Sequence, residues 1–191
     1  MSVILASQSP RRRELMEKFN IPFLVRVADI DETMDPTKDP AAEVARVSRL
    51  KAEATTCEDT DVVIAADTIV VCDGVVLGKP KDREDAHRML AMLSGRDHQV
   101  MTGLTVLKGK QGLSVTEITD LHFRELSQKE ISAYVASGDC DDKAGAYGIQ
   151  SGGALFAEKI VGDYYNVMGL PLCRLYRLLQ QIAPEVMEDI Q

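Results

Sequence analysis

The chain has 191 residues, of which 45% are hydrophobic, so it is long enough to bury a core as one domain or as two closely joined lobes. Its formal net charge of -8, from 22 basic and 30 acidic residues, argues against general electrostatic binding to nucleic acid or to an anionic membrane. No apolar run approaches transmembrane length, the first residues lack the layout of a signal peptide, and the four cysteines form no C-x-x-C pair. We therefore expect a cytoplasmic protein with reduced thiols.

The chain begins with a pattern typical of a strand that leads into a helix. Residues 3–6 are apolar, and S-Q-S-P-R-R-R follows at residues 7–13. Ser9 is a good N-cap, and Pro10 suits the first helical position because its missing N–H would have no partner there. The three arginines oppose the helix dipole, so a bound phosphate would offset their charge. The alternative is a basic turn exposed to solvent.

An acidic loop and a long helix come next. Residues 22–28 predict a strand, and D-I-D-E at residues 29–32 then starts a loop that could face a metal or a phosphate. The Asp-Pro pair at residues 39–40 predicts a helix that ends near residue 56. Lys51 lies on the apolar side of this helix. Such a lysine either extends to the protein surface, which is the commoner outcome, or meets a buried anion.

The strongest interior signal is V-V-I-A-A at residues 62–66, which is apolar on both faces, as in a central strand. Asp67 follows this run, and a carboxylate is costly to bury there unless it pairs with a cation or binds a metal. The alternative is a bulge or a break in the strand. Asp-Gly at residues 73–74 predicts a tight hairpin, after which Gly-Lys-Pro at residues 78–80 returns a lysine to the same end of the sheet.

The second half of the chain predicts a helix, two long strands, a helix with a capping box, a strand and a last helix. In chain order these elements cover residues 82–93, 98–107, 113–126, the stretch from 127, about 154–160 and about 170–182, with turns at 109–112 and 162–166. Residues 141–153 are rich in glycine, which suggests close approach of the backbone to a ligand; the alternative is a surface loop, which would have a similar composition. This segment matches neither a P-loop, a Rossmann fingerprint nor a serine hydrolase elbow.

The polar groups at the ends of the apolar elements share one chemistry. They are Arg11, Arg12, Glu32, Lys51, Asp67 and Lys79. Cationic side chains can neutralise a polyphosphate, and two carboxylates can hold a divalent metal ion. Attack of a water molecule on phosphorus, with activation by a metal or a base, would then need no side-chain nucleophile.

Several motifs, in this order along the chain, resemble the Maf family of nucleoside triphosphate pyrophosphatases. They are S-Q-S-P-R-R at 7–12, A-D-T at 66–68, G-K-P at 78–80, the segment 142–150 and G-L-P at 169–171. The resemblance runs from about residue 4 to the last helix. It implies an α/β fold similar to that of the inosine triphosphate pyrophosphatases, with an elongated mixed sheet flanked by helices. Residues 1–191 would form a single Maf-like domain with two lobes around a nucleotide cleft.

The resemblance also implies an activity: hydrolysis between the α- and β-phosphates, which gives a nucleoside monophosphate and pyrophosphate, with Mg²⁺ or Mn²⁺ as the divalent cofactor. Asp67 matches the proton acceptor of the family, and Glu32 matches the acidic residue that is placed with Asp67 at the metal. The phosphate-binding positions are Ser7, Arg12, Lys51 and Lys79. The positions that separate substrate groups are Arg11, Thr68 and Gln150.

These substrate positions are similar to those of the dTTP/UTP pyrophosphatase group. The 7-methyl-GTP group instead has tryptophan at the position of Arg11 and glutamine at that of Thr68. The amide of Gln150 could read the donor and acceptor edge of uracil or thymine, although it does not single out those bases. The expected substrates are dTTP, UTP and modified pyrimidine triphosphates.

The expected partners are the nucleoside triphosphate and, as would suit the family, a second copy of the chain, with no nucleic acid and no membrane. Two other functions stay open on the sequence. One is a nucleotide-binding protein that restrains septum formation with little turnover. The other is a phosphosugar or nucleotide-sugar enzyme that uses the same basic site.

Overall fold

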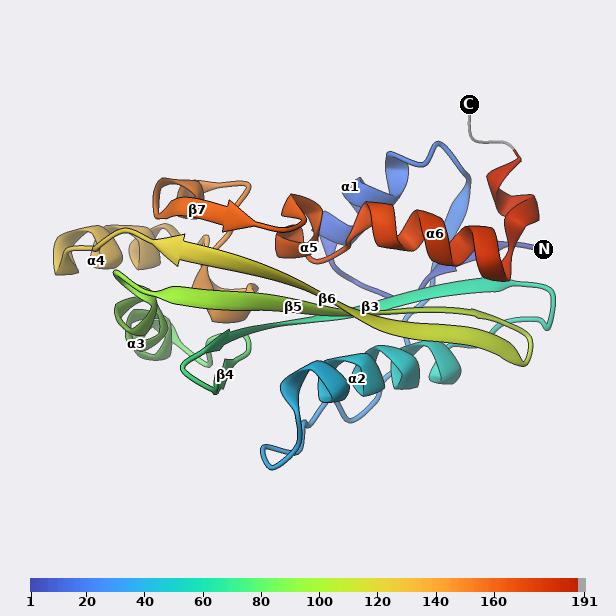
Figure 1. Cartoon of the computed structure of the whole chain (residues 1–191), viewed down its shortest axis with the longest axis horizontal. Coiled ribbons are helices and arrows are strands. Elements are labelled where there is room, and N and C mark those ends of the chain that lie inside the picture. The colour runs from blue at the N-terminus through green and yellow to red at the C-terminus, as the bar shows by residue number, and fades with distance from the viewer. Residues whose placement is uncertain (189–191) are drawn as a thin grey trace. The chain divides into compact units, whose positions relative to one another are not determined.

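The computed structural model describes residues 1–188, which form a mixed seven-stranded sheet flanked by helices (Figure 1). The strand order is β2-β1-β3-β5-β6-β7, and β4 pairs with β3. The strands are β1 (Val3–Leu5), β2 (Phe23–Val25), β3 (Val62–Cys72), β4 (Val75–Leu77), β5 (Asp97–Lys108), β6 (Gln111–Phe123) and β7 (Ala157–Val161). The helices are α1 (Pro10–Glu17), α2 (Pro40–Ala54), α3 (Arg83–Leu93), α4 (Gln128–Ser137), α5 (Tyr164–Met168) and α6 (Leu172–Ile182). Short 3-10 helices are η1 (Ala144–Ala146), η2 (Gly152–Leu155) and η3 (Pro184–Met187).

The chain divides into two compact units. The first unit comprises Met1–Asp67, Thr102–Glu117 and the chain from Gly169 onward, and the second unit comprises Thr68–Met101 and Ile118–Met168. Strands β3, β5 and β6 therefore contribute residues to both units. No helix among residues 1–188 is long and apolar enough to cross a membrane.

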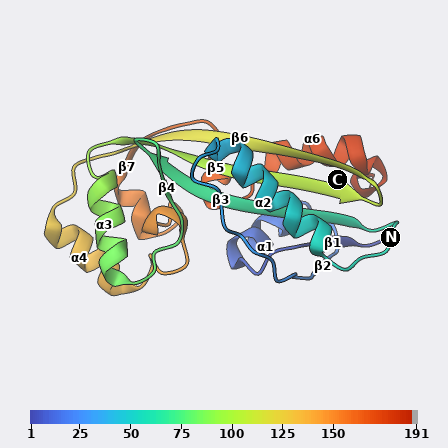
Figure 2. The ribbon, with the colours of Figure 1, turned by 90° about the horizontal axis from the view of Figure 1, so that it is seen from below.

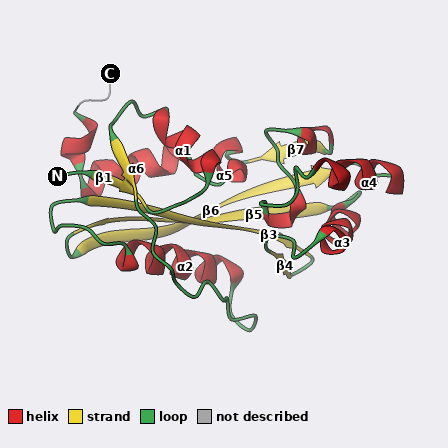
Figure 3. Cartoon of the chain, turned by 180° about the vertical axis from the view of Figure 1, so that it is seen from behind, coloured by secondary structure: helices red, strands yellow, loops and turns green. Residues whose placement is uncertain are grey.

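In the first unit, β1 lies between β2 and β3 and is parallel to both, so Leu5 pairs with Val25 on one side and with Ile64 on the other. Ile4, Leu5 and Ile64 are fully buried, as expected of strands with helices on both faces. Figures 1 and 3 show α2 on one face of this part of the sheet and α1 and α6 on the opposite face. Helix α2 lies so close to β5 that a Cβ atom on Gly103 would come within 2.1 Å of the Val44 carbonyl oxygen.

In the second unit, β3 and β4 form an antiparallel hairpin whose turn residues, Asp73 and Gly74, have φ angles of 49° and 77°. These positive values are what a two-residue type I′ turn needs, and the predicted hairpin is confirmed. Helices α3 and α4 pack against each other (Figure 2). The Ser127 capping box that starts α4 is also present. Four aromatic side chains in this core, together with His98, meet edge to face; they are Phe123, Tyr134, Tyr147 and Phe156.

Some element boundaries differ from the sequence prediction. Strand β3 continues through Asp67 without the break considered as an alternative, and β2 is limited to the three residues that pair with β1. The turn predicted over residues 162–166 is wrong in its second half, where α5 begins. The Asp163 carboxylate accepts a hydrogen bond from the Tyr165 N–H (2.7 Å), and the buried Asn166 amide donates to the Val100 carbonyl (3.0 Å), so a tertiary contact stabilises this helix.

Candidate active site

The start of α1 positions Arg12. Ser9 is the N-cap, and its hydroxyl accepts a hydrogen bond from the Arg12 N–H (3.5 Å). The guanidinium group of Arg12 donates from Nε to the Gly169 carbonyl (2.7 Å) and from Nη1 to the Ser7 hydroxyl (3.3 Å). The predicted strand-to-helix junction is confirmed, and Arg12 is partly buried within it while Arg13 is exposed. The guanidinium is therefore held in place from two distant parts of the sequence.

Lys51 lies in α2, which begins at Pro40 after the Asp39 N-cap. Its ammonium group donates to Asp67 Oδ1 (2.7 Å) and to Glu32 Oε2 (2.8 Å). The side chains of Lys51 and Asp67 are only 13% and 14% exposed, whereas that of Glu32 is 57% exposed. Of the two outcomes considered for Lys51, the structure has the contact with an anion, the largely buried carboxylate of Asp67.

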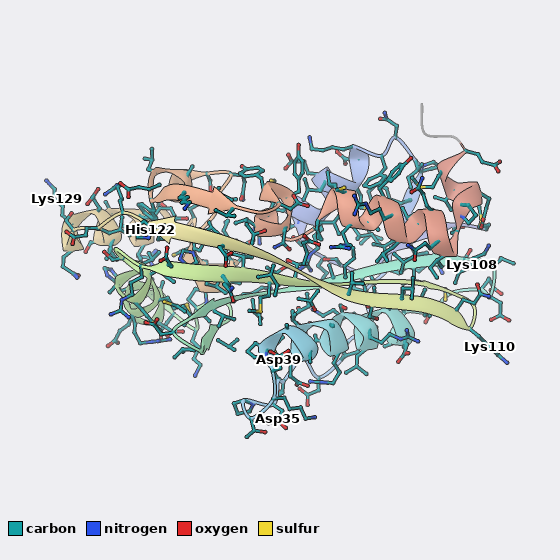
Figure 4. The ribbon with its side chains drawn as sticks, viewed as in Figure 1. Asp35, Asp39, Lys108, Lys110, His122 and Lys129 are labelled. Atoms are coloured by element: carbon teal, nitrogen blue, oxygen red, sulfur yellow. The ribbon has the colours of Figure 1, made fainter. Side chains whose placement is uncertain are left out.

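Helix α2 also holds the loop that carries Glu32. The Asp35 N–H donates to Glu43 Oε2 (2.9 Å), and Arg46 Nη2 donates to the Thr33 carbonyl (2.9 Å). Glu43 and Arg46 form an ion pair of 2.8 Å, and the hydrogen bond from Arg46 is the main reason that the pKa of Glu43 falls to about 2. Figure 4 shows Asp35 in the loop before α2 and Asp39 at the start of the helix. The loop is thus tied to α2 at Thr33 and Asp35, directly after Glu32.

Sequence reasoning did not single out Glu43 and Arg46. Their spacing of three residues on one helix was the available signal, since such pairs face each other on a helix surface. It could not reveal that Glu43 would be buried and would accept a hydrogen bond from a loop backbone. The contact of the Gly169 carbonyl with Arg12 could not be predicted from the sequence either, although Gly169 belongs to the G-L-P motif at residues 169–171.

Opposite charges influence one another across this cluster. Burial lowers the pKa of Arg12, Asp67 and Glu32 raise it, and Arg11 lowers it further, with a net decrease. Counted with Lys51, the cluster has three cations and two carboxylates, so its formal charge is +1. The cluster is therefore able to attract an anion, while Asp67 offers a carboxylate beside two cationic groups.

The oxygen donors suit a hard divalent cation, because the carboxylates of Glu32 and Asp67 converge on the same ammonium group. Within residues 1–188, no group of three or more His, Cys, Asp or Glu side chains is arranged to hold a metal ion. The pair would therefore supply only part of the coordination shell of a divalent ion. Mg²⁺ usually completes its shell with water and substrate phosphate oxygens, so a two-carboxylate site fits it.

Of the other predicted site residues, Arg11 lies half-buried in the first turn of α1, and three lie in the second unit. Thr68 follows Asp67 in β3, and Lys79 is exposed after β4, where the neighbouring Gly78 carbonyl accepts a hydrogen bond from the Gly145 N–H (3.0 Å). Gln150 is exposed in the turn between η1 and η2. The structure thus brings Ser7, Arg12, Glu32, Lys51 and Asp67 together in the first unit. The functional parts assigned to all of these residues, including Arg11, Thr68, Lys79 and Gln150, stay predictions.

Several known proteins are similar in sequence to this chain over almost its whole length. A dTTP/UTP pyrophosphatase of Alkaliphilus metalliredigens is 44% identical over 183 residues, which is 94% of this chain and 95% of that protein. A dTTP/UTP pyrophosphatase of Symbiobacterium thermophilum is 48% identical over 182 residues, with 95% and 94% covered. One of Pyrococcus furiosus is 44% identical over 179 residues, with 93% and 94% covered.

A solved structure of a HAM1 protein from Coxiella burnetii is similar to this chain with a TM-score of 0.48 and 16% identity, over 95% of this chain and 99% of that one. So distant a likeness says nothing about the site. The sequence relatives are much closer, and the model of the Maf-like protein family matches residues 2–182. The family predicted from the motifs is confirmed, and the chain belongs to the Maf family.

Proposed function

We propose that this protein hydrolyses dTTP and UTP to the nucleoside monophosphate and pyrophosphate. The observation that carries the proposal is the ammonium group of Lys51 between the carboxylates of Asp67 and Glu32, whose negative charges also act on Arg12. This cluster occurs in a Maf chain whose relatives at 44–48% identity bear the name dTTP/UTP pyrophosphatase.

The residues of the cluster can share the work of hydrolysis. Arg12 and Ser7 are oriented to bind phosphate oxygens, because the Gly169 carbonyl holds the guanidinium on its Nε side. Lys51 binds phosphate as well and stabilises the negative charge that grows on the leaving group. A water oxygen forms the new bond to phosphorus, its proton passes to the Asp67 carboxylate, and the phosphoanhydride bond breaks to release pyrophosphate.

Glu32 and Asp67 would hold the divalent ion, Mg²⁺ or Mn²⁺. When bound, the ion would neutralise part of the charge of the triphosphate. Lys51 already gathers the two carboxylates around one positive charge, so the protein keeps them near each other. The loop held by Glu43 and Arg46 keeps Glu32 within reach of this position.

Arg11, Thr68 and Gln150 would determine which nucleobase the enzyme accepts. Lys79 would bind a phosphate group of the substrate. The support is the pattern of residues at these positions, which is similar to that of the dTTP/UTP group. We also propose that residues 1–191 form one Maf domain with a nucleotide cleft. The protein would be located in the cytoplasm and would form a homodimer.

A panel of nucleoside triphosphates tests the proposal. Purified protein with Mg²⁺ or Mn²⁺ should release pyrophosphate from dTTP and UTP and leave ATP and GTP largely intact. Asp67→Ala and the near-isosteric Asp67→Asn should abolish this release, whereas Asp59→Ala, which removes an exposed carboxylate of the same unit, should not. Failure of the unmodified protein to hydrolyse any triphosphate would refute the proposal.

A further inference from the structure

The turn that carries Gln150 is tied to α4 by a buried tyrosine. The hydroxyl of Tyr134 accepts a hydrogen bond from the Gly148 N–H (2.9 Å) and donates one to Asp139 Oδ2 (2.7 Å). The ring of Tyr134 also packs edge to face on Phe156, just after η2. Tyr134 therefore contacts the chain on both sides of Gln150.

The carboxylate of Asp139 makes further contacts with the turn. Besides Tyr134, the Ser151 hydroxyl donates to Asp139 Oδ2 (2.6 Å), and the Lys143 ammonium lies 3.2 Å from Asp139 Oδ1. Lys143 also donates to the Asp139 backbone carbonyl (2.6 Å) and to Asp142 Oδ1 (2.8 Å). The carboxylate thus joins the end of α4 to the residue that directly follows Gln150.

The Tyr134 phenol and the Asp139 carboxylate each keep one protonation state around neutral pH. Burial, the hydrogen bond to Asp139 and the charge of that carboxylate raise the pKa of Tyr134. Burial acts to raise the pKa of Asp139, but the hydrogen bonds from Ser151, Tyr134 and Lys143 outweigh it, so this pKa is lowered. The phenol therefore stays a donor and the carboxylate stays a charged acceptor, which makes their bond a strong one.

The backbone of the turn is packed so closely that larger residues would collide at its glycine positions. A Cβ atom on Gly153 would lie 2.6 Å from the Gly148 carbonyl oxygen, and one on Gly148 would lie 2.4 Å from the Ser151 hydroxyl. A Cβ atom on Gly152 would meet the Tyr134 ring at 2.9 Å. The glycines let the chain fold back on itself and on Tyr134, while the side chain of Gln150 stays exposed.

We propose that Tyr134 and Asp139 are positioning residues that fix the turn around Gln150 and thereby set how well the enzyme distinguishes nucleobases. The inference rests on the proposed function, in which the Gln150 amide contacts the base. A glycine-rich turn without these bonds would pay the entropy of ordering at each binding event, and its amide would be poorly aligned. Discrimination by hydrogen bonds requires such alignment, because only then does a wrong base leave the amide unpaired.

The main test is Tyr134→Phe, which removes the hydroxyl and keeps the ring that packs on Phe156. Kinetics are measured with UTP and CTP, which differ in the donor and acceptor groups that an amide would read. We expect kcat/KM for UTP to fall about tenfold, chiefly through KM, with little change for CTP, so that the UTP/CTP ratio falls. Equal losses for both nucleotides would overturn the inference, because they would indicate general damage. Tyr164→Phe, at an exposed tyrosine of the same unit, is the matched control and should leave both values unchanged.

A double-mutant cycle shows whether Tyr134 acts through Gln150. Gln150→Ala alone should lower the UTP/CTP ratio, and the addition of Tyr134→Phe should then change the ratio less than about twofold. A further tenfold drop in the Gln150→Ala background would contradict the inference. If Tyr134→Phe does not fold, Ser151→Ala removes one bond to Asp139 at an exposed position and takes its place in the cycle.

Hydrogen exchange separates this inference from the proposed function, because it needs no substrate. The backbone amides of residues 148–152 should exchange faster in Tyr134→Phe than in the unmodified protein, while those of β3 should not change. Unchanged exchange at residues 148–152 would overturn the positioning role even if UTP is hydrolysed. Lack of turnover by the unmodified protein, with faster exchange in the variant, would refute the pyrophosphatase function and leave the positioning of the turn supported.

Discussion

Replacement of Lys51 by methionine is a demanding test of the candidate site. Methionine keeps an unbranched apolar stem on the inner side of α2 but removes the charge that lies 2.7 Å from Asp67 and 2.8 Å from Glu32. Asp67, with only 14% of its side chain exposed, would then be a carboxylate without its closest partner. Glu32 is 57% exposed, so water can solvate it after the change.

The size of the effect follows from these exposures. Removal of one partner from a buried ion pair typically costs about 3–5 kcal/mol. Here the cost is reduced because Arg12 still acts on Asp67 electrostatically, and the exposed pair with Glu32 contributes less than about 1 kcal/mol. We expect the free energy of unfolding to fall by about 2 kcal/mol, which for a chain of this length lowers the melting temperature by about 4–8 °C.

Urea denaturation of four proteins measures this cost: the unmodified chain, Lys51→Met, Asp67→Asn and the double variant. In the Lys51→Met background, Asp67→Asn should recover more than half of the lost stability because it removes the unpaired charge. Lys110→Met is the control, since Lys110 is an exposed lysine at the β5–β6 turn (Figure 4). Lys51→Met within about 0.5 kcal/mol of the unmodified protein, or no recovery in the double variant, would refute the reasoning.

Three further predictions concern phosphate binding, pH and packing. Arg12→Ala should raise KM about tenfold or more for every triphosphate, whereas Arg11→Trp should change which base is accepted; equal losses across all nucleotides for both variants would contradict this division. Burial lowers the pKa of His98 to about 4, so the unfolded chain binds a proton there between about pH 6.5 and pH 4 while the folded chain does not. As the pH falls from about 6.5 to about 4, the free energy of unfolding measured with urea should therefore decrease by about 3 kcal/mol through His98. This decrease should be absent in His98→Gln, and an identical pH dependence of the two proteins would contradict the prediction. Gly103→Ala should destabilise the fold by about 3 kcal/mol because the new methyl group collides with the α2 backbone, whereas Gly78→Ala, with open space around it, should change the melting temperature little.

Features that depend on neighbours a few residues away could be predicted from the sequence. Ser9 and Asp39 cap their helices through N–H groups three residues ahead, and the Asp73-Gly74 hairpin depends only on the two φ angles of the turn. The five motifs at residues 7–12, 66–68, 78–80, 142–150 and 169–171 together indicated the family, which the match over residues 2–182 confirms. In each case the information is local or lies in the residue types themselves.

Other features depended on how distant segments pack. The helical wheel placed Lys51 on an apolar face, but only the structure brings Asp67 and Glu32, 16 and 19 residues away, to its ammonium group. The bond from Arg12 to the Gly169 carbonyl joins residues 157 positions apart, and helix α5 forms where the buried Asn166 meets Val100.

By itself, then, the sequence determined the family, the capped helices and the residue types of a phosphate site, because these follow from local conformational preferences and side-chain chemistry. Only the tertiary structure decided which cation faces Asp67, which carbonyl holds Arg12 and what fixes the turn around Gln150. The physical reason is that a buried ion pair or hydrogen bond owes its geometry to the packing of segments far apart in the chain, and no local pattern specifies that packing.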